Sequence, residues 1–357
     1  MKNNILFIGF ELESDRKEAV SINFKNHINN VLSPEYGSYN FSLSSKKNVV
    51  EHLISLPMYL IRIISIIKTR KITHVHDLFV LPLISVLFLV PIKIAFPEVK
   101  LIKELHNNFG FSKIFNLETL LRITLSSKFS IYILSKVVDS FYSRSEYLSK
   151  YWEIKYIPQF VNIHRLNRNV FDKPKVFNIC YLGHPLRKKG VYIFPELISK
   201  LSPEATKIVK FNFAFSNLGS KKDLVKLIKI AASKNRVKVE FSSEVNPQVY
   251  FRNNHIFLLP SIDEYSATSV PNTILEAMEA GCVVITPINK INSTVIRNNY
   301  NGLLVNDINV NSLLKVINSL VLSKKAYSKI SLNSRKYIEL NYNLSYIKTC
   351  FKQIYEN

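Results

Sequence analysis

Residues 255–287, HIFLLPSIDEYSATSVPNTILEAMEAGCVVITP, decide the fold class. An apolar run ends at Pro260, and a polar, acidic loop, a helical pattern around residues 273–280, Gly281 and a second apolar run follow it. A helix between two buried strands predicts a unit of a parallel sheet, and glycine commonly ends such a helix. The stretch therefore predicts an α/β fold. It also places the acidic loop at the carboxyl end of a strand, where open α/β sheets bind ligands.

The same alternation covers the rest of the chain. Apolar runs at residues 4–10, 72–76, 99–105 and 137–143 are separated by helix-length stretches, and a second series begins after the polar, proline-punctuated residues 159–176. Two doubly wound parallel sheets account for this rhythm. We expect one domain over residues 1–165 and a second over residues 166–340. The last segment, 341–357, is predicted to be a helix that packs back on the first domain.

Composition narrows the class of protein. With 357 residues and 47% hydrophobic side chains, the chain can fill two cores. The chain has three cysteines, Cys180, Cys282 and Cys350, which are far apart in sequence and set in apolar runs. An odd number of such cysteines favours a reducing compartment such as the cytoplasm. Acidic residues follow the first apolar run, so we expect a strand there and not a signal peptide. The net charge is +22, but the sequence has no blocks of one sign and no aromatic-flanked basic motifs of the RNA-binding type, so nucleic acid is not indicated. The charge is consistent with an anionic ligand or an anionic membrane surface, the alternative being a Lys- and Asn-rich composition that carries no function.

Two apolar segments raise the question of a membrane. Residues 78–96 are almost uncharged and nearly long enough to span a bilayer, but two prolines and Lys93 favour a buried core helix. Residues 53–71, LISLPMYLIRIISIIKTRK, are apolar on one side and carry cations without nearby acids. Such a segment predicts contact with an anionic membrane surface. The alternative explanation of the same pattern is a basic helix end that is exposed to solvent. The cations are Arg62, Lys68, Arg70 and Lys71.

The deciding stretch resembles a known family. Pro260 and Ser261, then Glu264, then LEAM at 275–278 with Gly281, are similar to the donor domain of retaining GT-B glycosyltransferases of family 4, the glycosyl transferases group 1. Collinear matches are YLGHPLRKKG at 181–190, NGLLV at 301–305, and residues 137–152 with YIPQFVN at 156–162. The resemblance implies the GT-B fold: two Rossmann-like domains facing a cleft, with the acceptor bound by the first and the nucleotide sugar by the second.

The resemblance also implies roles for individual residues. Lys189 would bind the donor diphosphate, and Arg187 would join it because His184 stands where many members have arginine. Glu276 would hold the nucleotide ribose, and His106 would face the donor sugar from the first domain. The expected catalytic residues are therefore Lys189, Arg187 and His106. The expected donor-binding residues are Gly183, Glu264, Thr268, Ser269, Val270, Pro271, Asn272, Thr273 and Glu276.

One position departs from the family pattern. Members usually carry a glutamate eight positions before the one that Glu276 matches, whereas this chain has Thr268 there and its nearest upstream acid is Glu264. Either the loop is longer or the first carboxylate is lost. Three readings follow: an active transferase, a GT-B sugar-nucleotide epimerase, and a catalytically inactive scaffold that binds sugar nucleotides.

No metal or other cofactor is expected. His74 and His76 alternate on a strand beside Asp77, which is spacing seen in metal sites, and Glu11, Glu13 and Asp15 could mimic an acidic metal motif. The family, however, neutralises the leaving diphosphate with basic side chains and helix dipoles. The implied partners are a UDP- or GDP-linked sugar and a glycan or lipid-linked acceptor. The implied function is retaining sugar transfer in bacterial surface polysaccharide synthesis, at the inner face of the cell membrane.

Overall fold

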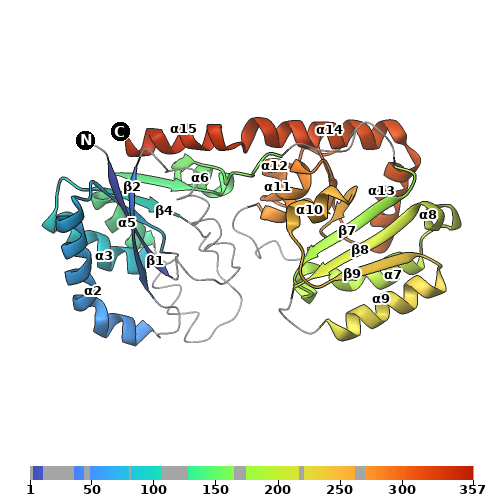
Figure 1. Ribbon diagram of the computed structural model, residues 1–357, viewed down its shortest axis with the longest axis horizontal. Helices are drawn as coiled ribbons and strands as arrows, with labels where there is room; N and C mark the ends of the chain where they lie inside the picture. The colour runs from blue at the N-terminus through green and yellow to red at the C-terminus, as the bar shows by residue number, and fades with distance from the viewer. Residues whose placement is uncertain are drawn as a thin grey trace. The chain divides into compact units, whose positions relative to one another are not determined.

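The computed structural model describes residues 3–10, 36–43, 49–79, 82–105, 128–164, 174–216, 221–261 and 270–356. The chain divides into two compact units, residues 1–159 with 344–357, and residues 160–343. The boundary lies a few residues before the one expected at 165, and the last helix, α15 (Leu344–Tyr355), belongs to the first unit. Each unit is a parallel six-stranded sheet flanked by helices, so the predicted two-sheet α/β fold is confirmed (Figure 1).

The first unit is built on a sheet with the strand order β2-β1-β3-β4-β5-β6. Its strands are β1 (Asn4–Phe10), β2 (Gly37–Leu43), β3 (His74–Asp77), β4 (Lys100–Glu104), β5 (Ser140–Ser143) and β6 (Lys155–Tyr156). Its described helices, besides α15, are α2 (Val49–Arg70), α3 (Pro82–Ala95), α5 (Lys128–Val137) and α6 (Glu146–Trp152). Every strand pair is parallel, so all carboxyl ends lie at one edge of the sheet.

Helix α3 corresponds to the apolar segment 78–96. Phe88, Leu89 and Ile92 are buried in the core of the first unit, whereas Ile94 is exposed. Over the part of the chain that the structure describes, no helix has both the length and the apolar character needed to cross a bilayer. The apolar composition of this segment therefore serves packing against the sheet.

A buried polar chain joins α15 to the strands of the first unit. The His76 ring lies between two tyrosines, with Nδ1 2.7 Å from the Tyr355 hydroxyl and Nε2 2.8 Å from the Tyr142 hydroxyl. Tyr142 donates to Glu104 at 2.6 Å, and the Arg144 guanidinium lies 2.9 Å from the same carboxylate. Buried polar groups must be paired in this way, and here the pairing fixes the last helix on the sheet.

Among the described residues, the candidate metal ligands His74, His76 and Asp77 do not form a metal-binding cluster. Both ring nitrogens of His76 are hydrogen-bonded to tyrosines, and burial lowers the pKa of His74 to about 4. No group of three or more His, Cys, Asp or Glu side chains is arranged to hold a metal ion within the described ranges. Glu11, Glu13 and Asp15 lie outside those ranges.

The second unit has the strand order β12-β11-β10-β7-β8-β9, again with parallel pairs throughout. Its strands are β7 (Phe177–Gly183), β8 (Val209–Phe215), β9 (Lys238–Ser242), β10 (Ile256–Leu258), β11 (Val283–Pro287) and β12 (Leu303–Val305). Its helices are α7 (Phe194–Ser199), α8 (Pro203–Ile208), α9 (Lys222–Lys234), α10 (Pro247–Arg252), α11 (Asn272–Glu279), α12 (Asn292–Val295), α13 (Val310–Leu322) and α14 (Lys324–Asn341).

This order is that of a dinucleotide-binding sheet. Strands β7, β8 and β9 follow one another toward one edge of the sheet, and β10, β11 and β12 follow one another toward the opposite edge, starting beside β7. The reversal lies between β7 and β10, and ligands bind outside the carboxyl ends of the strands at such a point.

All three cysteines are free thiols; Cys180 and Cys282 are buried in this unit and Cys350 is half-buried on α15.

Candidate functional site

The loop after β7 packs directly against the end of β10. Gly183 ends β7, and a short 3₁₀ turn, Arg187–Lys189, follows and closes at Gly190 with φ of 70°. A Cβ atom at Gly190 would lie 1.7 Å from the Pro260 carbonyl oxygen, so only glycine fits there. The Ser261 hydroxyl donates to the Lys188 carbonyl at 3.4 Å, although 73 positions separate them. The predicted diphosphate residues therefore lie beside the start of the acidic loop.

The turn makes this edge of the sheet strongly positive. Arg187 and Lys188 are exposed and Lys189 is half-buried. The Arg187 guanidinium stacks 4.5 Å from the centre of the Tyr192 ring, an arrangement that leaves its N–H donors available. The pKa of His184 is lowered by partial burial and by the charges of Lys189 and Lys188. Concentrated positive charge at a strand end suits a diphosphate.

Helix α11 begins beyond the acidic loop at the carboxyl end of β10. Val270 is buried, and Pro271, Asn272 and Thr273 are half-buried around the helix start. The next turns bury an apolar face against the core and end, as the sequence predicts, at Gly281 with φ of 73°. The N-terminus of α11 thus lies at the ligand-binding edge, where the positive end of the helix dipole favours anions.

Glu276 is half-buried on α11. Burial, and secondarily the negative charge of Glu279, raises its pKa to about 7. No hydrogen bond or ion pair engages its carboxylate among the residues that the structure describes. A carboxylate without such a partner is available to accept hydrogen bonds from a ligand, and its charge changes near neutral pH.

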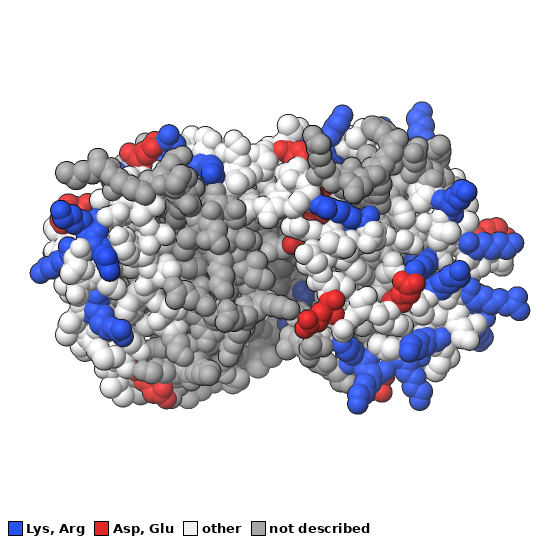
Figure 2. Space-filling view, viewed as in Figure 1, with Lys and Arg blue, Asp and Glu red and all other residues white. Residues whose placement is uncertain are grey.

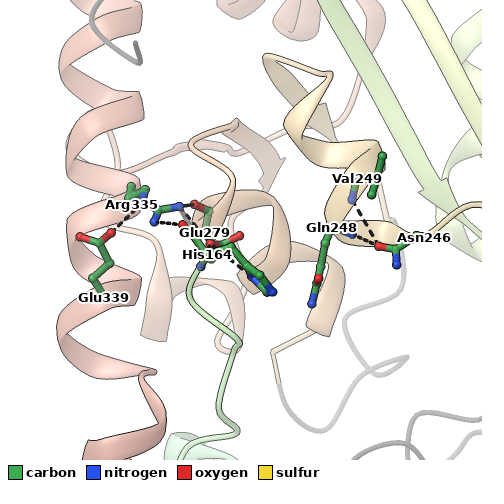
Figure 3. Close-up of polar contacts among 7 residues, drawn as sticks. All are labelled: His164, Asn246, Gln248, Val249, Glu279, Arg335 and Glu339. Atoms are coloured by element: carbon green, nitrogen blue, oxygen red, sulfur yellow. Dashed lines mark hydrogen bonds and ion pairs between the residues drawn. The ribbon is translucent and has the colours of Figure 1, made fainter. Parts of the chain in front are cut away.

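A network that the sequence does not predict holds the other end of α11 (Figure 3). Arg335 of α14 lies 2.9 Å from the Glu279 carboxylate, also donates to the Glu279 carbonyl, and reaches Glu339 at 2.7 Å. The His164 backbone N–H donates to the Glu279 carboxylate at 2.9 Å, and the His164 carbonyl accepts from Arg335. Glu279 stands three positions after Glu276, a spacing that predicts that both side chains lie on one face of the helix. No local sequence pattern predicts the contact with Arg335, because that residue is too distant in sequence.

Most of the predicted donor-binding residues that the structure describes thus lie at one edge of the second sheet, next to the neighbouring strands β7 and β10. Gly183 ends β7, and Arg187 and Lys189 follow that strand, whereas residues 270–273 and Glu276 follow β10. The remaining predicted residues, Glu264, Thr268, Ser269 and His106, lie outside the described ranges. The roles of all these residues stay predictions.

Comparisons with known proteins agree with this geometry. Residues 165–337, most of the second unit, match the family model described as glycosyl transferases group 1. No curated protein matches the chain.

Solved structures match over almost the whole chain. HepE from Anabaena in complex with UDP has a TM-score of 0.74 at 13% identity, with 99% of each chain covered. A glycosyltransferase from Rickettsia africae has a TM-score of 0.68 at 15% identity. Sucrose-phosphate synthase from Thermosynechococcus elongatus has a TM-score of 0.68 at 14% identity. Each covers 99% of this chain and is itself covered to 98%. At these identities the likeness shows the GT-B fold. The second unit therefore matches the glycosyl transferases group 1, and the chain as a whole has the fold of GT-B glycosyltransferases.

Proposed function

We propose that the chain transfers a sugar from a nucleotide-diphosphate sugar to a glycan or lipid-linked acceptor, with retention of configuration, in bacterial surface polysaccharide synthesis. The observation that carries the proposal is the basic turn Arg187–Lys189, which is packed on the end of β10 at the switch point of the second sheet. Structures of HepE hold UDP and UDP-glucose, which favours a UDP-linked donor over a GDP-linked one.

In this proposal Lys189 and Arg187 act on the donor diphosphate. Negative charge grows on the diphosphate as its bond to the sugar breaks, and fixed cations stabilise that charge more in the transition state than in the ground state. Glu276 accepts hydrogen bonds from the ribose hydroxyls. Residues 264–273 surround the donor sugar and phosphate, and His106 contacts the sugar. The acceptor hydroxyl attacks from the leaving-group side, so configuration is retained. No divalent cation takes part.

The direct test is product analysis by mass spectrometry. The protein is incubated with a panel of UDP- and GDP-linked sugars, with and without lipid-linked and glycan acceptors. We expect slow donor hydrolysis alone and a sugar-bearing product with the matching acceptor. An epimerised nucleotide sugar formed without acceptor would instead indicate an epimerase. Donor binding without turnover of any kind would indicate an inactive scaffold.

We further propose that α2 brings the first unit to the inner face of the cell membrane from the cytoplasm. Its buried face carries Tyr59, Ile63 and Ile67, but its opposite face exposes Ile54 by 76%, Met58 by 50% and Ile61 by 68%. Four cations lie on or directly after the helix and are exposed: Arg62, Lys68, Arg70 and Lys71. Such a row of exposed aliphatic side chains with cations suits insertion at an anionic interface.

Vesicle sedimentation tests the α2 proposal. Replacing Arg62, Lys68, Arg70 and Lys71 together by Gln should release the protein from vesicles of phosphatidylcholine and phosphatidylglycerol, most clearly at low salt. Unchanged sedimentation would remove α2 as a membrane contact.

A further inference from the structure

Helix α9 gives the second unit a strongly cationic face. Six basic side chains on α9 and the start of β9 are exposed: Lys222, Lys226, Lys229, Lys234, Arg236 and Lys238. Across residues 221–238 the sequence holds a single acid, Asp223. Figure 2 shows Lys and Arg side chains gathered over the position that α9 occupies at the lower right of Figure 1.

This positive charge is not neutralised within the described structure. Lys222, Lys226, Lys229 and Lys234 form no ion pair with any described carboxylate. The acid on the adjacent strand, Glu240, is itself paired with Lys210. The Lys229 ammonium lies 5.8 Å from the centre of the Phe241 ring, a contact that leaves its charge in place. A helix that keeps unpaired like charges exposes them to an external anion.

The same helix exposes aliphatic side chains among these lysines. Leu227 is 47% exposed and Ile230 is 56% exposed, while Leu224 and Ile228 are fully buried on the core side. The lysines next to them in sequence, Lys226 and Lys229, are exposed as well. The surface is therefore mixed: flexible cations interleaved with branched apolar groups.

We propose that this face of α9, on the second unit, contacts an anionic lipid bilayer, in addition to the contact proposed for α2. Lysine stems lie along apolar surface and carry their ammonium groups to lipid phosphates, while Leu227 and Ile230 enter the interface between headgroups and acyl chains. Nucleic acid fits less well, because α9 offers no aromatic ring for base stacking and residues 221–238 contain a single arginine, Arg236. The inference does not depend on the donor or on the reaction.

The α9 face belongs to the second unit and α2 belongs to the first, so the variants of each helix test that helix's own contact with lipid.

The test compares matched charge variants of the full-length protein. Lys222, Lys226, Lys229 and Lys234 are replaced by Gln in one variant. The control variant replaces four exposed lysines of α13 and α14, Lys315, Lys325, Lys329 and Lys336, so the net charge changes equally. Binding is measured to vesicles of phosphatidylcholine with phosphatidylglycerol and to vesicles of phosphatidylcholine alone. A third variant, Leu227→Ser with Ile230→Ser, removes only the aliphatic groups.

We expect the α9 lysine variant to bind mixed vesicles at least about tenfold more weakly than wild type, and the control variant to change far less. The Leu227→Ser, Ile230→Ser variant should bind mixed vesicles more weakly than wild type while keeping its binding to soluble polyphosphate. Equal losses in the α9 and control variants, or no loss in either, would overturn the proposal. So would an aliphatic variant with full vesicle binding, because that outcome indicates a soluble polyanion as the partner. Donor turnover in detergent-free buffer should be unchanged in all variants.

Discussion

The Glu276 carboxylate shows how a single position acquires chemistry that its motif does not specify. The LEAM pattern predicts the residue and its place on a helix. Its pKa of about 7 arises from burial and from Glu279, which the tertiary structure determines. Arg187 is a similar case, since the sequence predicts a cation after β7 but not the stacking of that cation on Tyr192. Motifs therefore predict residue type, and packing sets charge and orientation.

Donor binding should depend on pH through Glu276. The raised pKa means that the carboxyl is protonated below about pH 7, and a protonated carboxyl is a poorer acceptor for two ribose hydroxyls. Donor affinity should therefore fall as pH falls through 7, by up to about tenfold per pH unit, and level off above it. Calorimetry with a nucleotide sugar measures this, and Glu276→Gln should make the profile flatter. A profile that is identical in the two proteins would show that Glu276 does not touch the donor.

At the scale of elements, α11 depends on a distant partner at its C-terminal end. Its N-terminal end follows the acidic loop, and its C-terminal end is held by Arg335, whose guanidinium pairs with the buried Glu279. Glu279 is only 1% exposed. Removing one member of a buried ion pair leaves the other charge without compensation, which costs more than the pair itself contributes.

Arg335→Gln should therefore lower the free energy of unfolding by about 3 to 5 kcal/mol. Adding Glu279→Gln to this variant should restore part of the loss, because the orphaned charge is removed. Lys336→Gln, the adjacent exposed position on α14, should stay close to wild type. Thermal and denaturant unfolding measure these effects. Strictly additive losses in the double variant would argue against a direct coupling between Arg335 and Glu279.

Helix boundaries near the site follow from particular residues. Helix α7 covers Phe194–Ser199, and a 3₁₀ turn over Val191–Ile193 precedes it. Gly190 adopts φ of 70° against Pro260, and Pro195 lies in the first turn, so the regular helix starts late. The contact between Gly190 and Pro260 joins segments far apart in sequence, and no local pattern reveals it.

At the scale of the whole molecule, the alternation of apolar runs predicts two parallel sheets, and both are observed. The strand order could not be predicted from the runs themselves, because long-range pairing depends on crossovers that leave no local pattern. The donor motif lies within the stretch that the family model matches, residues 165–337. The first unit carries weaker matches, and its polar chain through His76 and Tyr355 joins residues from opposite ends of the sequence.

Transfer should not require a divalent cation, since the proposed diphosphate site uses Lys189 and Arg187. Enzyme treated with EDTA is expected to keep its rate within about twofold, as measured by product formation in metal-free buffer. Loss of activity that Mn²⁺ or Mg²⁺ restores would contradict this expectation and direct attention to Glu11, Glu13 and Asp15.

The most direct test of the account is the kinetic comparison of Lys189→Ala and Glu276→Gln with the same donor and acceptor. If Lys189 meets charge that develops on the diphosphate, Lys189→Ala should lower kcat by about 10²- to 10³-fold with little change in donor KM. If Glu276 holds the ribose equally in ground and transition states, Glu276→Gln should raise the donor KM and leave kcat within a few fold. Folded variants that both show wild-type kinetics would contradict the placement of the donor at the ends of β7 and β10.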